Sequence, residues 1–337
     1  MTNPSPLSQV PHSIAAPYRE PTRAGVLAAA EKLAALVPQT PLLPIVLPSG
    51  QTVWAKAECL QPVGSFKIRG AWHRLSDMTA EERARGIVAV SSGNHAQGVA
   101  WAAKRLGIAA RIVMPADAPA VKAEATRAMG SEVVPYDRAT ESRDAIAADL
   151  IAQSGAILVH AFGDPWVIEG QGSMGIELSA QMETWAGGTP TRIVCPCGGG
   201  GLASGLAIAC PDAEVVPVEP EGWDDVVRSL DSGKIEAVAK DATATSCDAL
   251  QTTQTYPMNF NIMKSHAMHG VTVTDTEVHA AQRLAFSALH LVVEPGGATA
   301  LAALMAGKVP ADGRTAVILS GGNVDPIAFA RTISAEA

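Results

Sequence analysis

The most informative stretch of this sequence is Gly64–Ala71, which reads Gly-Ser-Phe-Lys-Ile-Arg-Gly-Ala. It sets one lysine, Lys67, among small and apolar residues. A lysine amine that is partly removed from water has a lowered pKa and becomes a nucleophile toward carbonyl carbons. Most lysines are solvated surface charges, and we expect this of Lys56 and Lys122 among others. The meaning of Lys67 therefore depends on other motifs in the chain.

Two such motifs lie where a predicted strand leads into a predicted helix. Gly198–Gly201 is a run of four glycines, and Ser91–Gln97 reads Ser-Ser-Gly-Asn-His-Ala-Gln. Backbone N–H groups at the start of a helix attract anions, and glycines let a phosphate group come close. A turn whose glycines serve only the backbone is the alternative, and four consecutive glycines make it the weaker one. For His95 we favour a buried histidine at a helix start over a metal ligand or an acid–base group.

Two motifs near the C-terminal end complete the set. Glu294–Ala298 reads Glu-Pro-Gly-Gly-Ala, and Ser320–Asn323 reads Ser-Gly-Gly-Asn. In this order, the motifs resemble those of the fold type II pyridoxal-phosphate enzymes of the threonine dehydratase and serine racemase group, which includes 3-hydroxyaspartate ammonia-lyases. The resemblance runs from about Thr40 to Pro326. It implies pyridoxal 5'-phosphate as the cofactor, bonded to Lys67, and a small amino acid as the substrate.

The resemblance also implies roles for individual residues. Lys67 would take the α-proton as general base and Ser92 would act on the opposite face of the substrate, so these two are the predicted catalytic residues. The Ser320 hydroxyl would face the ring nitrogen without holding it protonated, which favours β-elimination over transamination. The predicted cofactor-binding residues are Phe66, Lys67, Asn94, Gly198, Gly199, Gly200, Gly201, Leu202 and Ser320. The predicted substrate-binding residues are Ser91, Ser92, Gly93, Asn94, His95 and Arg143.

An acidic loop, Glu219–Asp225, resembles the divalent-cation loop of the serine racemase branch. By that resemblance Glu219 and Asp225 would supply carboxylates and Trp223 its carbonyl oxygen. Oxygen ligands of this kind suit Mg²⁺, Mn²⁺ or Ca²⁺. A solvated acidic turn is the alternative.

Three positions bear on the choice of substrate. Ser92 stands where many dehydratases of the group have alanine and where the racemase has serine, which leaves racemisation open. Arg143 matches a racemase arginine that reaches the second carboxylate of a dicarboxylic ligand, and a planar guanidinium binds carboxylates in a bidentate manner. The alternative for Arg143 is an arginine on a helix surface. Ala249 replaces a glycine of the group, which argues against threonine as the main substrate.

Alternating apolar and alanine-rich stretches predict an α/β fold with two open, mostly parallel twisted sheets flanked by helices. Expected strands are 87–90, 110–114, 132–136, 156–159, 192–195, 214–218 and 315–319, with helices near 94–106, 119–129 and 139–153. We expect a discontinuous large cofactor-binding domain, 1–79 and 166–337, and an inserted small domain, 80–165, that carries the substrate carboxylate loop. The active site would lie between them, as in the tryptophan synthase β-like fold.

The composition and charge of the chain limit which binding partners it can have. The chain of 337 residues carries a net charge of -8 and has a pI of about 5.5, which argues against a nucleic-acid partner. No apolar run approaches the roughly 20 residues that span a bilayer. Five cysteines, an odd number in a chain of this size, favour a reducing cytoplasm over a disulfide framework. By analogy with the group, the protein would be a homodimer or homotetramer.

The sequence thus predicts an ammonia-lyase that converts a β-hydroxy amino acid, threonine or serine, to a 2-oxo acid and ammonia. A 3-hydroxyaspartate ammonia-lyase that yields oxaloacetate is close to it, with Arg143 and Ser92 as the reasons. An amino-acid racemase acting on serine or aspartate is a third hypothesis. A protein that binds the cofactor without turnover is the alternative from a different class.

Overall fold

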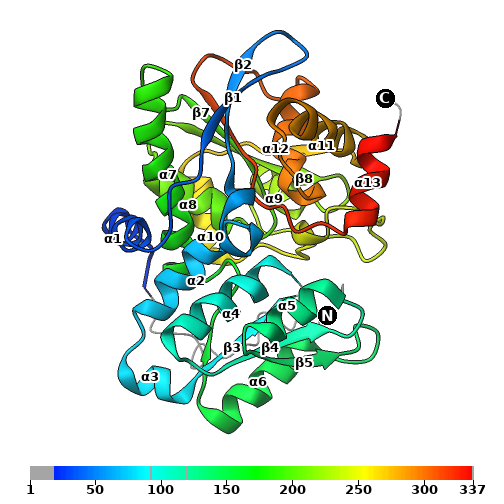
Figure 1. Ribbon diagram of the computed structural model, residues 1–337. Coiled ribbons are helices and arrows are strands. Elements are labelled where there is room, and N and C mark those ends of the chain that lie inside the picture. Colours follow the sequence, from blue (N-terminus) through cyan, green and yellow to red (C-terminus); the bar gives the residue numbers. More distant parts are fainter. Residues whose placement is uncertain (1–18, 92, 119, 336–337) are drawn as a thin grey trace.

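Two sheets flanked by helices make up the fold (Figure 1). The computed structural model describes residues 19–91, 93–118 and 120–335. Ser92, a predicted catalytic and substrate-binding residue, lies outside the described residues. The arrangement confirms the predicted α/β class with two mostly parallel sheets.

The larger sheet has six strands among the described residues, in the order β1-β2-β10-β7-β8-β9. All neighbouring strands run parallel except β1 and β2, which form an antiparallel pair at one edge. The sequence did not predict this pair, because Pro44 interrupts the first strand, and proline is tolerated on edge strands. The strands are β1 (Leu42–Val46), β2 (Thr52–Lys56), β7 (Arg192–Pro196), β8 (Glu214–Pro220), β9 (Val271–Val273) and β10 (Thr315–Ile318).

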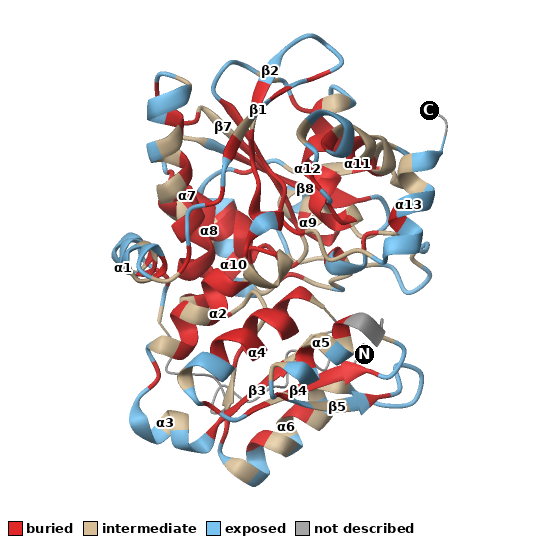
Figure 2. Cartoon of the chain, in the orientation of Figure 1, coloured by how far each residue is buried: buried red, intermediate tan, exposed pale blue. Residues whose placement is uncertain are grey.

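Helices cover both faces of this sheet, and Figure 2 shows its strands buried between them. Successive residues of a strand point to opposite faces, so Ile193 and Val194 of β7 belong to two separate cores. Val194 packs on the side of α11 and α12, and Ile193 on the side of α7 and α8. No helix among the described residues is long and apolar enough to cross a membrane. The helices are α1 (Arg23–Ala34), α7 (Pro165–Trp185), α8 (Gly201–Ala209), α9 (Asp225–Ser232), α10 (Pro257–Ser265), α11 (Asp275–Leu289), α12 (Pro295–Met305) and α13 (Pro326–Ser334).

The smaller sheet has the order β5-β4-β3-β6, with all pairs parallel. Its strands fall between residues 87 and 158, and the domain boundaries proposed from the sequence stay a prediction. One face packs on α4 and the other on α6. The elements are β3 (Ile87–Val90), β4 (Ala110–Pro115), β5 (Glu132–Tyr136), β6 (Ile157–Leu158), α3 (Ala80–Arg85), α4 (Asn94–Leu106), α5 (Ala120–Ala128) and α6 (Arg143–Ser154).

The helix α2 (Lys67–Ser76) joins the two halves of the structure, since it packs against both α4 and α7. The contact with α7 requires two glycines. A Cβ added to Gly170 would lie 2.5 Å from the Cα of Gly70. Because backbone atoms cannot move away as a flexible side chain can, this approach is possible only without side chains. Lys67 is thereby placed at the start of a helix that is held from two sides.

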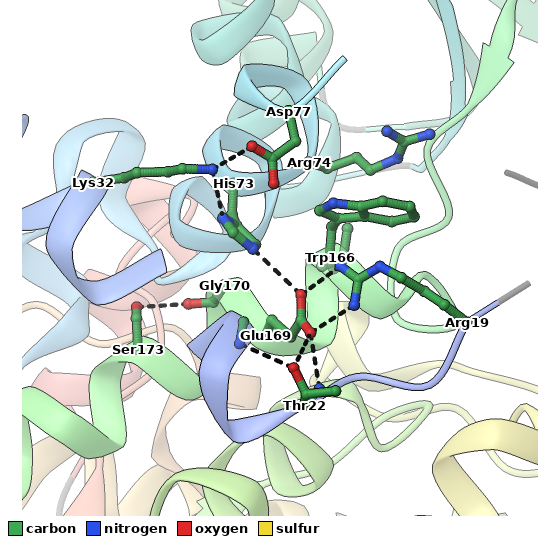
Figure 3. Close-up of polar contacts among 12 residues, drawn as sticks. Arg19, Thr22, Lys32, His73, Arg74, Asp77, Trp166, Glu169, Gly170 and Ser173 are labelled. Carbon is green, nitrogen blue, oxygen red and sulfur yellow. Dashed lines mark hydrogen bonds and ion pairs between the residues drawn. The ribbon is translucent and has the colours of Figure 1, made fainter. Parts of the chain in front are cut away.

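The far end of α2 is tied to the N-terminal segment by the buried carboxylate of Glu169 (Figure 3). Arg19 donates two hydrogen bonds of 2.6 Å to its two oxygens, and Thr22 N–H donates one of 2.8 Å. His73 is in the last turn of α2, and its Nε2 lies 3.3 Å from Glu169 Oε2. The Arg19 guanidinium also stacks 3.9 Å from the centre of the Trp166 ring. Residues far apart in sequence therefore share one carboxylate.

Two lysines that were expected at the surface are buried, so that expectation was wrong. Lys56 is fully buried, donates to Thr40 O at 2.7 Å, and pairs with Glu177. Lys122 is also buried and pairs with Asp248. The cause is the same in both cases, because a carboxylate distant in sequence compensates the desolvated charge.

Candidate active site

Lys67 has the surroundings of a reactive amine. Its Nζ donates to Ala161 O at 3.1 Å and lies 5.1 Å from the centre of the Phe66 ring. Burial lowers the pKa of Lys67 to about 8, although the nearby Cys197 and Glu294 act in the opposite direction. The residue as a whole is only half-buried. A half-buried lysine whose amine has a lowered pKa fits a residue that reacts with a carbonyl group.

Glu294, just before α12, is a site residue to which the sequence analysis gave no role. Its carboxylate is buried, and Asn94 Nδ2 donates a hydrogen bond to Oε1, whereas Oε2 has no partner among the described residues. Burial raises the pKa of Glu294 to about 7, although the charge of Lys122 opposes this. Gly321 makes room for the carboxylate, since a Cβ there would lie 2.0 Å from Oε1. The Glu-Pro-Gly-Gly motif was the available signal.

The Asn94 side chain is fixed from two sides. Besides its bond to Glu294, Asn94 Oδ1 accepts a hydrogen bond of 2.8 Å from Asn323 Nδ2, which also donates to Val63 O. Phe66 N–H donates to Ser320 O at 3.1 Å. Four of the quoted motifs therefore meet here.

The segment Ser91–Gln97 follows β3, and its residues from Asn94 onward form the first turn of α4. Ser91 Oγ accepts a hydrogen bond of 3.2 Å from Gly93 N–H. His95 is buried and its Nε2 bonds to Val159 O at 3.0 Å, whereas Nδ1 has no partner among the described residues. Burial lowers the pKa of His95 to about 3, so the ring is neutral at physiological pH. These contacts fit the buried histidine at a helix start that we favoured, and the role of the loop in binding stays a prediction.

The glycine run leads from β7 into α8 and is closely packed. Gly200 has a φ of +85°, a left-handed conformation that favours glycine. A Cβ on Gly199 would lie 2.3 Å from the Phe162 ring. The N–H groups in the first turn of α8, which begins with Gly201 and Leu202, have no acceptor within the helix. They are therefore free to donate hydrogen bonds to an anion.

Arg143 begins α6 at the carboxyl ends of the strands of the smaller sheet. It lines a cavity of about 40 Å³ together with Ser91, Arg138 and Asp248. Its ion pair with Asp144 is long, 3.8 Å. The structure therefore brings Arg143 to the same cavity as the first residue of the predicted carboxylate loop. Arg138, a second guanidinium in this wall, was missed because its sequence context carries no motif.

His160, two residues beyond β6, was also missed. Its Nδ1 accepts a hydrogen bond of 2.8 Å from Gly163 N–H, which leaves the proton of the neutral ring on Nε2. Burial, then the charges of Arg143 and Lys67, lower the pKa of His160 to about 4. His160 is therefore neutral at physiological pH, and the charges of Arg143 and Lys67 both act on it.

The acidic loop contains two buried carboxylates. Glu219 accepts hydrogen bonds from the N–H groups of Val226 and Val227 at the start of α9. Both carboxylate oxygens of Asp225 lack hydrogen-bond partners among the described residues. Burial raises the pKa of both groups, that of Asp225 to about 7. The charge of Asp225 further raises the pKa of Glu219, and the charge of Asp224 further raises that of Asp225. Trp223 donates its indole N–H to Thr243 O. The part of the chain that the structure describes contains no cluster of three or more His, Cys, Asp or Glu side chains suited to a metal, so a cation here would need carbonyl oxygens or water as further ligands.

The fold and this site define a class of protein. The chain belongs to the family of pyridoxal-phosphate dependent enzymes, whose family model matches residues 33–321. The L-threo-3-hydroxyaspartate ammonia-lyase of a Pseudomonas species is 40% identical over 308 residues, which cover 89% of this chain and 94% of that protein. The serine racemase of Schizosaccharomyces pombe is 35% identical and covers 93% of this chain and 98% of its own. The crystal structure of a threonine deaminase from T.th. has a TM-score of 0.82, with 40% identity over 90% of this chain and 99% of that one.

Pyridoxal phosphate is therefore the cofactor, and the described residues fit it. Lys67 is half-buried as a residue, and the pKa of its amine is lowered. The run Gly198–Gly201 offers a helix start without side chains, and the buried Oε2 of Glu294 still lacks a hydrogen-bond partner. An aldehyde, a phosphate and a polar ring are the groups that such an arrangement accommodates.

Proposed function

We propose that this protein is a carbon–nitrogen lyase that converts a β-hydroxy amino acid, such as threonine or serine, to a 2-oxo acid and ammonia by α,β-elimination. The observation that carries the proposal is the amine of Lys67, which is half-buried and has a pKa lowered to about 8. Similar proteins include ammonia-lyases for L-threo-3-hydroxyaspartate and for L-threonine. Both activities remove a hydroxyl group and an amino group from neighbouring carbons.

Pyridoxal phosphate, when bound, supplies an electron sink for the charge left on the α-carbon. Lys67 removes the α-proton as general base. The N–H groups of Ser91–Gln97 hold the α-carboxylate, and those of Gly198–Leu202 hold the phosphate. Asn94 and Ser320 would hydrogen-bond to the cofactor. The β-hydroxyl would leave with one proton, so that it and the α-proton together account for the water lost, and hydrolysis of the released enamine by one water would give the 2-oxo acid and ammonia.

A second candidate, a 3-hydroxyaspartate ammonia-lyase that yields oxaloacetate, is favoured by the cavity beside Ser91. Arg143 and Arg138 both line it, and its volume of about 40 Å³ leaves room for a group the size of a carboxylate. The long ion pair of Arg143 with Asp144, 3.8 Å, leaves this guanidinium available to a ligand. Ser92 would act on the opposite face of the substrate.

Oxo-acid release by the purified, cofactor-loaded protein tests both candidates. The substrates are L-threonine, L-serine and the separate isomers of 3-hydroxyaspartate, each with and without Mg²⁺. Faster turnover of one hydroxyaspartate isomer, lost in Arg143→Gln but retained in the surface variant Arg127→Gln, would support the dicarboxylate. A preference for threonine or serine would instead support the alternative, that Arg143 is an arginine on a helix surface with no role in substrate binding. A protein that keeps the cofactor absorption band and releases no oxo acid from any of them would contradict the lyase proposal.

Three further features belong to this proposal. Glu219, the Trp223 carbonyl and Asp225 would hold Mg²⁺ or a similar cation, which would neutralise two buried carboxylates and stabilise the loop before α9. The protein would act as a homodimer or homotetramer, by analogy with the resembled group. It would work in the cytoplasm, which the five free, buried cysteines support.

A further inference from the structure

Lys122 in α5 is a buried cation beside the predicted carboxylate loop, and the proposed function gives it no task. Its side chain is 8% exposed, and Nζ donates to Asp248 Oδ2. The amine lies next to the loop, since a Cβ on Gly93 would be 3.6 Å from Nζ. It also lies close enough to Glu294 to act on that carboxyl group. A positive charge therefore stands at the start of α4, where N–H groups already favour an anion.

The two partners of this ion pair differ in their access to water. The side chain of Asp248 is 44% exposed, against 8% for Lys122. An exposed carboxylate that leaves the pair regains its hydration, so its departure costs little. A buried ammonium left without an anion keeps its full loss of hydration with nothing to compensate it. Lys122 thus requires an anion beside it at all times, whereas Asp248 does not require Lys122.

We propose that Lys122 binds the α-carboxylate of the amino-acid substrate, and that Asp248 neutralises its amine when no substrate is present. The proposal deepens the proposed function and rests on it in one respect, namely that Ser91–Gln97 receives the α-carboxylate. In this arrangement the substrate exchanges places with Asp248 at the amine. Lys122 supplies a full charge that the N–H groups of the loop lack.

A structural role makes the opposite prediction for one variant. If the Lys122–Asp248 pair only fastened α5 to the loop of the larger sheet, removal of either partner would loosen the site and weaken binding in the same way. If Lys122 is the ligand, Lys122→Met weakens binding of the carboxylate and Asp248→Asn does not, because it removes a competitor. The two variants therefore separate the two roles.

The measurement is the dissociation constant of L-alanine for the cofactor-loaded protein, followed by the change in the cofactor absorption spectrum. L-Alanine carries the α-carboxylate and no leaving group, and L-alaninamide carries a neutral amide in its place. We expect Lys122→Met to weaken L-alanine binding about tenfold to a hundredfold, the range for a lost charge-assisted hydrogen bond, and L-alaninamide binding less than about twofold. Asp248→Asn should bind L-alanine as tightly as the wild type or more tightly.

Controls keep the test decisive. Lys104→Met removes the same charge from the exposed end of α4 and should leave L-alanine binding unchanged. Lys122→Arg retains a cation and should bind L-alanine within a few-fold of the wild type. Equal weakening in Lys122→Met and Asp248→Asn, or no change in Lys122→Met, would overturn the proposal. A wild type that binds L-alanine but releases no oxo acid from L-threonine, L-serine or any 3-hydroxyaspartate isomer would instead count against the lyase function and leave the Lys122 result intact.

Discussion

Replacement of the buried carboxylate Glu169 by glutamine should destabilise the protein strongly, and by an amount that depends on pH. Burial alone would raise the pKa of Glu169, but hydrogen bonds from Arg19, His73 and Thr22 more than offset it and lower the pKa to about 2, from 4.5 in an unfolded chain. This difference corresponds to about 3 kcal/mol of folding free energy at pH 7. Arg19 is 33% exposed and can rehydrate when its partner is lost, which places the cost at the lower end for a broken buried pair.

The sign of the pH dependence follows from the lowered pKa. The stabilisation is complete above pH 4.5 and is lost as the pH falls toward 2, because protons then bind the unfolded carboxylate first. At pH 3.5 the wild type should have lost about 1 kcal/mol of this contribution, and Glu169→Gln should have lost none. The free-energy difference between the two proteins therefore narrows as the solution becomes more acidic.

Urea unfolding followed by far-UV circular dichroism at pH 7, 5 and 3.5 measures these differences. Glu183→Gln, an exposed position on the same helix, is the matched control and should lie within about 0.5 kcal/mol of the wild type at every pH. In a double-mutant cycle, Arg19→Met and Glu169→Gln should be strongly non-additive. A Glu169→Gln protein as stable as the control at pH 7, or a difference that does not narrow with acid, would refute the assignment of this carboxylate as the anchor.

Other consequences concern the site. In the apoprotein, the rate of bonding of pyridoxal phosphate, measured by absorbance, should rise about tenfold per pH unit below 8 and level off above it, because only the neutral Lys67 amine reacts. Gly170→Ala should lower cofactor affinity and melting temperature together, since its Cβ would meet the Gly70 backbone at 2.5 Å, whereas Gly313→Ala, with open space around it, should change neither. Mg²⁺ should raise the melting temperature of the wild type by mass action but not that of Asp225→Asn, and an equal rise in both would exclude this loop as the cation site.

Local patterns in the sequence were sufficient for the central strands and helices. The strand 87–90 and the helix 94–106 were placed at their observed bounds, and the other expected strands lie within two residues of the observed ones. The strand β9 was not expected. Parallel strands buried on both faces have continuous apolar runs, which makes them visible without any knowledge of the fold. The antiparallel pair of β1 and β2 was not predicted, because the pattern of β1 contains Pro44 and one of its faces is exposed.

Contacts between distant segments could not be predicted in this way. Asn94 and Glu294 are 200 residues apart, and nothing near either one indicates the other. The same applies to the cavity shared by Ser91 and Arg138 and to the buried charge of Lys122, whose partner lies 126 residues away. A charged residue looks like a surface residue in the sequence, because only the folded chain shows which opposite charge compensates its loss of water. The motifs could be recognised, but the groups that tune them could not.

The helix α2 explains why stability and chemistry are connected in this chain. Its ten residues carry the amine of Lys67 at one end and His73, one of the groups around Glu169, in the last turn. The two residues are six positions apart, or about 9 Å along a helix axis. A helix of this length moves as a rigid body, so whatever holds its last turn also limits where its first residue can lie. Glu169 contacts the last turn of α2, and Lys67 lies in the first turn. By tying α2 to α7 and to the N-terminal segment, Glu169 therefore restricts the position of the Lys67 amine relative to the glycine run.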